Sequence, residues 1–173
     1  FSGTNAFGVS VSVLKPDVDL ALEILKDVLT DAKFSEQEFE KSRAFIIASI
    51  KEADDDIFEV GMNALKKELF AGSPYGLRSI GQIKSVSALK PADAAVFYKK
   101  YYQPNNMVIA ISGDAASGKV MGKIRALFSD LKKNDLVIPP IQGTAIAGPK
   151  KSSIVMDKEQ SLMILGFKTV PRR

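Results

Sequence analysis

Three residues, Gly113, Gly118 and Lys119, stand at the G-x-x-x-x-G-K spacing of a phosphate-binding loop. In such a loop backbone N–H groups surround the phosphates, the lysine reaches them, and a following Ser or Thr hydroxyl binds magnesium. Here Val120 follows the lysine and has no oxygen to offer a metal. Asp114 stands where a helix N-cap is expected, and its carboxylate would repel a phosphate at the helix N-terminus. The pattern therefore favours a strand-to-helix turn, and a nucleotide-binding domain is the least favoured function.

The densest group of carboxylates is Glu52 with the run Asp54–Asp56. Such a group could bind calcium, but the alternating acidic residues that precede a glycine in an EF-hand loop are absent. A charge run of this kind is typical of a solvated helix end and of the cap of the next helix. We therefore expect these residues to have a structural role.

Two missing residue types exclude several kinds of catalytic centre. The 173 residues contain no cysteine and no histidine. Disulfides, thiolate zinc sites, Ser-His and Cys-His catalysis, and every metal site that uses histidine are thus excluded within this chain. No apolar run approaches the roughly 18 residues that cross a bilayer. The segment 1–10 lacks the features of a signal peptide and resembles the middle of a strand, so we expect a piece of a longer protein.

The net charge of +4, from 24 basic and 20 acidic residues, argues against nucleic-acid binding. The most basic aromatic segment is 97–102, FYKKYY, which could stack bases and touch phosphates. We expect instead that Phe97 and Tyr101 share a helix face and pack inward, while Lys99 and Lys100 are solvated.

Periodicity predicts the elements that position these residues. Residues 7–13, FGVSVSV, alternate as in a strand with one buried face, and 107–112, MVIAIS, reads as a buried strand. Mostly helical sequence separates these two strands, unlike the regular alternation of a doubly wound fold. Two more strand-like runs follow at 152–157 and 161–167. The order predicts an α+β fold, with helices packed on one face of a mainly antiparallel sheet.

The domain organisation follows from a change of composition after residue 131. Residues 1–131 are predicted to form one α+β domain. Residues 132–151 have three prolines, two glycines and no helical period, and are predicted to be a linker. Residues 152–173 would complete the sheet or open a second domain.

The ordered series of segments resembles the M16 family of zinc metallopeptidases, the pitrilysin, insulinase and mitochondrial-processing-peptidase group. SGTNAFGVSVSVL resembles the strand after the zinc helix, and LALEILKDVLTDAKFSEQEFEKSR resembles the long helical pair. The most recognisable block has a P-Y-G turn, a helix ending in F-Y-x-x-Y-Y, and a P-x-N-M strand ending in G-D. DKEQSLMILGF resembles the entry into the next repeat. The resemblance implies a LuxS/MPP-like metallohydrolase fold that lacks its N-terminal part.

The family's zinc chemistry uses an inverted motif, H-x-x-E-H, whose histidines bind zinc and whose glutamate acts as the base on the metal-bound water. A later glutamate completes the ligands, and aligning the helix by Arg43 and its acidic tail puts Ser49 at that position. Serine is a poor zinc ligand. Glu52, three residues on, shares roughly that helix face and is a minor alternative ligand. The family turn commonly reads H-P-Y-G, where this chain has Ser73.

The resemblance therefore implies a non-catalytic lobe of an M16-type zinc metalloendopeptidase. The chain alone is expected to be inactive, with no catalytic or metal-binding residue of its own. It would form part of a peptide-binding chamber, while zinc and proteolysis belong to a partner lobe in the same chain or in a homologous subunit. The alternative is a structural M16-like subunit without peptidase activity. The family's Arg/Tyr substrate pair is expected beyond Arg173, and the substrate, compartment and oligomeric state do not follow from the sequence.

Overall fold

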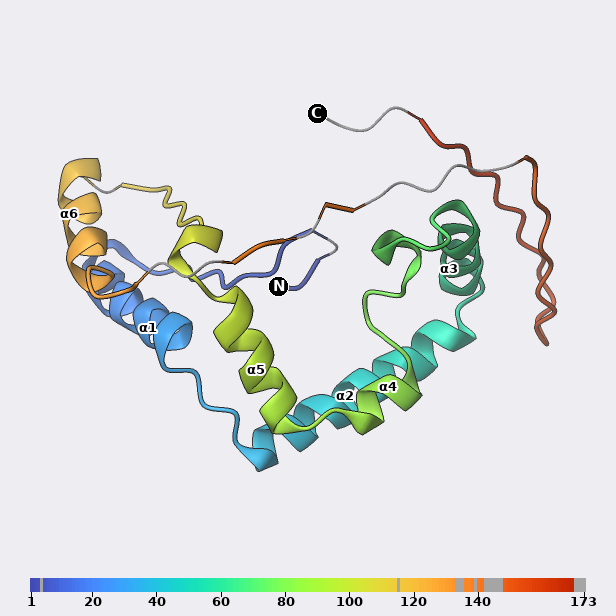
Figure 1. Cartoon of the computed structure of the whole chain (residues 1–173), viewed down its shortest axis with the longest axis horizontal. Helices are drawn as coiled ribbons and strands as arrows, with labels where there is room; N and C mark the ends of the chain where they lie inside the picture. The colour runs from blue at the N-terminus through green and yellow to red at the C-terminus, as the bar shows by residue number, and fades with distance from the viewer. Residues whose placement is uncertain (4, 115, 133–135, 139, 142–147, 170–173) are drawn as a thin grey trace. The chain divides into compact units, whose positions relative to one another are not determined.

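The computed structural model describes residues 1–3, 5–114, 116–132, 136–138, 140–141 and 148–169. The chain divides into two compact units, and each is described by itself. The first unit comprises residues 1–36 and 90–138, and the second comprises residues 37–89 and 139–173. The elements of both are coloured along the chain in Figure 1. The predicted division into 1–131, a linker at 132–151 and 152–173 stays a prediction, because residues 133–135, 139 and 142–147 of that linker lie outside the described residues.

The first unit consists of helices joined by extended segments. Its elements are η1 (Lys15–Asp17), α1 (Val18–Thr30), α5 (Pro91–Tyr101), η3 (Pro104–Asn106) and α6 (Ser117–Leu127). Helix α1 packs beside α6 (Figure 1), and Lys123 of α6 pairs with Asp19 of α1. Leu22 and Val120 are buried on these two helices, because each belongs to an apolar stripe at helical spacing.

An aromatic cluster connects α5 to the rest of the first unit. The hydroxyl of Tyr98 donates to the Val28 carbonyl at 3.3 Å and accepts from the Ala32 N–H at 3.4 Å, at the end of α1. Tyr98 also packs against Tyr102, with 4.6 Å between ring centroids. Phe97 contacts Tyr101 at 4.5 Å, as predicted for one helix face, but its side chain is 49% exposed, so the expected inward packing is only partly correct.

The second unit is built around two long helices. Its elements are α2 (Glu36–Asp55), which begins at the unit boundary, α3 (Ile57–Leu69), η2 (Pro74–Gly76) and α4 (Ile83–Ala88). Ile50 on α2 is 1% exposed and marks the centre of its packing. Arg43 donates to the carbonyls of Ser87 and Leu89 and so connects α2 to the C-terminal end of α4. These contacts satisfy carbonyls that a helix end leaves without intrahelical partners.

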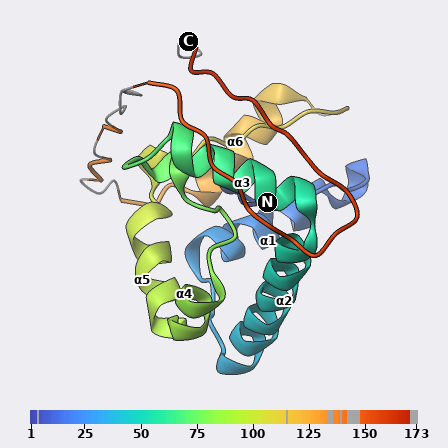
Figure 2. The same ribbon diagram turned by 90° about the vertical axis from the view of Figure 1, so that its right-hand side faces the viewer.

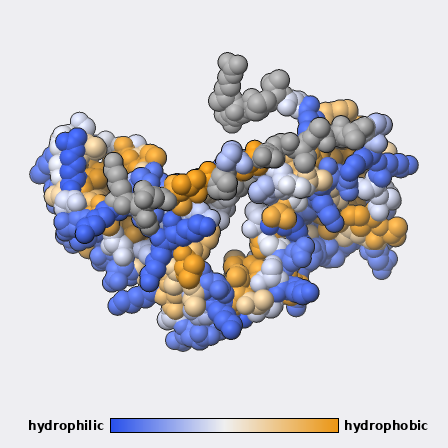
Figure 3. Space-filling view, viewed as in Figure 1, coloured by the Kyte–Doolittle hydropathy of each residue, from blue (hydrophilic) through white to orange (hydrophobic). Residues whose placement is uncertain are grey.

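The extended segment 148–169 passes across α3 in the second unit (Figure 2). A Cβ placed on Gly61 would lie 2.8 Å from Ile164 Cδ1, and one on Gly166 would lie 2.7 Å from Leu65 Cδ1. The two glycines therefore allow the segment and the helix to approach closely. The alternate residues Met163 and Leu165 are 85% and 76% exposed. Figure 3 shows apolar side chains reaching the molecular surface.

The predicted antiparallel sheet, and with it the α+β class, is wrong for the described residues. The segments 7–13, 107–112, 152–157 and 161–167 form no β-ladder there, and the one isolated bridge joins Ser2 to Phe7. A helix satisfies its own N–H and C=O groups, whereas a strand needs a neighbouring chain at the correct distance. Alternation predicts which side chains share a face, but it does not supply that neighbour.

Replacing Gly166 with alanine is expected to lower the free energy of unfolding by about 1–3 kcal/mol, because the new methyl group overlaps Leu65 and Leu69. Gly122 is the matched control, since nothing lies within 4 Å of its Cβ position and it stands in the middle of α6. Gly122→Ala should stabilise by roughly 0.5–1 kcal/mol through helix propensity. Urea unfolding followed by circular dichroism measures both, and equal effects would contradict the close packing of Gly166.

Burial, followed by the proximity of Tyr98, raises the pKa of Tyr102 above the ordinary value of 10.0. The folded chain therefore holds this proton more tightly than the unfolded chain, and the corresponding stability is present below pH 10 and is lost as the pH rises further. Tyr102→Phe should flatten this alkaline loss in a series of thermal unfolding curves from neutral to alkaline pH. A loss of the same slope in the variant would contradict the assignment.

Candidate functional site

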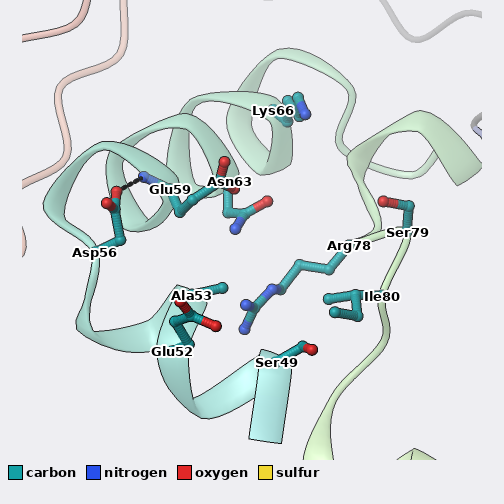
Figure 4. Close-up of a pocket in the computed structure, with 10 residues that line it drawn as sticks. All are labelled: Ser49, Glu52, Ala53, Asp56, Glu59, Asn63, Lys66, Arg78, Ser79 and Ile80. Atoms are coloured by element: carbon teal, nitrogen blue, oxygen red, sulfur yellow. Dashed lines mark hydrogen bonds between the residues drawn. The ribbon is translucent and has the colours of Figure 1, made fainter. Parts of the chain in front are cut away.

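Ser49, the residue expected at the position of the family's zinc glutamate, lines a polar pocket of about 400 Å³ in the second unit. Figure 4 shows the side chains that surround it. They come from α2, from α3 and from the segment after η2: Ser49, Glu52, Ala53, Asp56, Glu59, Asn63, Lys66, Arg78, Ser79 and Ile80. Spacings of three and four residues place the members from each helix on one face. The structure thus brings together Ser49 and Glu52, the two positions considered from the sequence.

Arg78 extends into this pocket from the segment after η2 (Figure 4). Its Nη1 lies 2.6 Å from Asp54 Oδ1, and its side chain is 20% exposed. The Nε and Nη2 atoms are buried and have no hydrogen-bond partner among the described residues. A buried donor without a partner is unfavourable by about 1–3 kcal/mol, and by more in a charged group. The guanidinium therefore brings a positive charge with unused hydrogen-bonding capacity into the pocket.

The donors of this pocket do not fit zinc. Ser49 offers a neutral hydroxyl, and the Asp56 carboxylate already accepts the Glu59 N–H at 2.8 Å as the N-cap of α3. The positive charge of Arg78 opposes a divalent cation at the same place. Within the part of the chain that the structure describes, no group of three or more His, Cys, Asp or Glu residues is arranged to hold a metal ion. The lining of this pocket therefore gives no support to zinc binding.

The acidic run after Glu52 is divided among three different contacts. Asp54 pairs with Arg78, Asp55 lies 2.8 Å from Lys158 Nζ, and Asp56 caps α3. This division agrees with the structural role expected of a charge run at a helix end. One consequence, the Arg78 contact, has no signal in the local sequence, because the two partners are 24 residues apart.

Ser73, which stands where the resemblance leads one to expect a histidine, is buried next to η2. Its hydroxyl accepts a hydrogen bond from the Tyr75 N–H at 3.4 Å and caps the short 3₁₀ helix. Ser73 does not line the pocket of Ser49 and Arg78. The residue therefore has a turn-forming role in this structure.

The phosphate-loop pattern occupies a turn before α6, but the expected N-cap is wrong. Helix α6 begins at Ser117 with Ala116 as its N-cap residue, and Asp114 instead pairs with Lys15 at 2.8 Å. Gly113 has a φ of +140°, which side-chain-bearing residues rarely adopt, so glycine serves the turn. Val120, the residue after the lysine of the pattern, is buried on α6. These observations give nucleotide binding no support.

Among the helices of the described ranges, none is long and apolar enough to cross a membrane.

Two family models match nearly the whole chain. Residues 4–82 match insulinase, peptidase family M16, and residues 88–173 match the peptidase M16 inactive domain. An uncharacterized zinc protease of Mycobacterium leprae is 28% identical over 163 residues, which are 92% of this chain and 37% of that protein. A non-peptidase homolog of Helicobacter pylori, YmxG, is 24% identical over 95% of this chain and 38% of its own length. The chain thus spans well under half of these relatives.

Solved structures share the fold. A protease from Helicobacter pylori matches with a TM-score of 0.70 and 21% identity, over 76% of this chain and 33% of that one. The peptidase M16 inactive domain from Pseudomonas fluorescens matches with a TM-score of 0.68 and 21% identity, over 75% of this chain and 32% of that one. Both likenesses concern the fold alone.

Restoring a glutamate at position 49 is not expected to create a zinc site. Ser49→Glu adds one carboxylate, but Arg78 keeps its positive charge in the pocket and no histidine is present. Equilibrium dialysis with zinc should show the same low binding for the variant and for the parent chain. Stoichiometric zinc on the Ser49→Glu variant would contradict the conclusion that the pocket does not fit the metal.

Proposed function

The chain belongs to the M16 peptidase family, and from this premise we propose that it works as a non-catalytic lobe that encloses peptides for a zinc-bearing partner lobe. The observation that carries the proposal is the pocket around Ser49. The position aligned with the zinc glutamate holds a hydroxyl, and the Arg78 guanidinium supplies a positive charge beside it. The lobe would contribute a wall and binding contacts, while the partner performs the hydrolysis.

The zinc of the proposed assembly belongs to the partner lobe. Several relatives are named zinc proteases, which supports zinc in the family, and this chain has no histidine with which to bind it. Zinc in the partner would activate a water molecule for attack on the peptide bond. The residues of this chain would bind and orient the peptide. They would transfer no proton to or from the reacting atoms.

Exposed backbone in the extended segments supports a peptide-enclosing role. The segment 161–167 lies against α3 with one set of alternate side chains, and it forms no β-ladder with described residues. Unpaired backbone groups of this kind can form hydrogen bonds with an extended peptide. Every second side chain of the bound peptide then points toward the protein surface. The partner lobe would be either a second lobe of the same chain or a homologous subunit.

A second candidate is a structural M16-like subunit without peptidase activity. The match to a non-peptidase homolog of Helicobacter pylori favours it. The two candidates differ in the partner: a lobe that carries H-x-x-E-H supports the peptidase assembly, whereas a partner without that motif supports the structural subunit.

Coexpression with a zinc-bearing M16 lobe from the same genome tests the main proposal. The chain alone should not cleave a library of quenched fluorescent peptides in the presence of zinc, and the mixture should cleave faster than the partner lobe alone. Lys119→Ala in the first unit serves as a control and should leave that rate unchanged. Lys119 lies in the first turn of α6, where no binding site is proposed. Cleavage by the isolated chain, or a mixture no faster than the partner, would overturn the proposal.

A further inference from the structure

The unused edge of Arg78 has the geometry that binds a carboxylate. In a guanidinium group the Nε–H and one Nη–H point in parallel from the same edge, and together they match the two oxygens of a carboxylate. Nη1 of Arg78 is already paired with Asp54, and the two nitrogens without partners among the described residues are Nε and Nη2. Both belong to this parallel edge. The structure therefore leaves one bidentate edge without a partner among the described residues, next to a pocket of about 400 Å³.

The remaining charges of the pocket restrict which carboxylate fits. Three acidic side chains line it, Glu52, Asp56 and Glu59, together with two basic ones, Lys66 and Arg78. Asp56 is occupied as the N-cap of α3, so Glu52 and Glu59 are the carboxylates available to a ligand. A simple anion would be repelled by these carboxylates, and a simple cation would be repelled by Arg78. A ligand that carries both charges satisfies both sides.

We propose that the pocket binds the zwitterionic end groups of a free amino acid or short peptide, with its carboxylate on the Nε and Nη2 edge of Arg78 and its ammonium group at Glu52 and Glu59. The volume is in the range of small-molecule sites. The Nε and Nη2 atoms are buried, so binding requires side chains of the lining to rotate, and the exposed Glu52 and Lys66 are long and flexible.

This inference rests on the proposed function for the source of the ligand, because a chamber that encloses peptides during proteolysis exposes its walls to short products. The binding itself is inferred from Arg78 and the residues that line its pocket, independently of the proposed function.

The test is a titration of the whole chain with glycylglycine, followed by nuclear magnetic resonance shifts and equilibrium dialysis. Saturable binding with a dissociation constant below about 10 mM is expected. Acetate and methylammonium, which each carry one of the two charges, should bind at least about tenfold more weakly. Alanine and triglycine distinguish a free amino acid from a peptide as the preferred source of the end groups. Binding of acetate as tight as that of glycylglycine, or no binding of any zwitterion, overturns the proposal.

Two variants locate the site. Arg78→Lys keeps the positive charge beside Asp54 but loses the bidentate edge, and it should weaken glycylglycine binding by about tenfold. Glu59→Gln removes a negative charge that would attract the ammonium group, so it should also weaken glycylglycine binding. Glu59 is exposed and the change leaves the Asp56 cap in place, so this variant tests the site even if Arg78→Lys fails to fold. Lys119→Ala should bind as the parent chain does. Unchanged affinity in a folded Arg78→Lys, or in Glu59→Gln, overturns the assignment.

A negative result in the binding assay can be distinguished from a negative result in the cleavage assay. Loss of zwitterion binding with partner-dependent cleavage intact removes this inference and leaves the proposed function standing. Binding without partner-dependent cleavage removes the proposed function, and with it the source assigned to the ligand.

Discussion

The ion pair between Arg78 and Asp54 determines the character of the pocket in the second unit. Its 2.6 Å contact joins the segment after η2 to the C-terminal end of α2 and keeps the guanidinium beside Ser49. An exposed pair contributes little to stability, but this side chain is only 20% exposed, and its charge is screened less by water. The same charge opposes a metal and leaves an edge free for a carboxylate. The poor fit of this pocket to zinc and the proposed ligand class both rest on this one side chain.

A second constraint is that helices and extended segments differ in how they satisfy their backbone. Helices α1, α2, α3, α5 and α6 close their own hydrogen bonds, so each forms wherever its apolar stripe finds a neighbour. The extended segments among the described residues, by contrast, need a neighbouring stretch of backbone to pair their N–H and C=O groups. Gly61 of α3 lies close to the side chains of Leu162 and Ile164, and Gly166 of the segment lies close to Leu65 and Leu69, so the segment packs against α3. Packing of this kind buries an apolar face without forming a sheet.

The helix starts were the most predictable features, because local chemistry decides them. Pro91 stands at the first position of α5, where its missing N–H leaves no hydrogen bond unmade, and Asp56 caps α3, as expected of an acidic run between two helices. Asp114 was mispredicted as the cap of α6: the helix begins at Ser117, and the Asp114 carboxylate pairs instead with Lys15, far away in the sequence. The sheet was mispredicted for a related reason. Both errors concern partners that a local pattern does not contain.

From the sequence by itself come the family resemblance, the lack of any histidine, and the serine where a zinc glutamate is expected. Helical spacing also placed Ser49 and Glu52 on one face, because that relation depends only on the 3.6-residue period. The tertiary structure alone decided that Arg78 reaches the same pocket, that Asp54 holds it there, and that its Nε and Nη2 stay without partners among the described residues. The reason is physical: a side chain 24 residues away becomes a neighbour only when the turn after α3 returns the chain to α2.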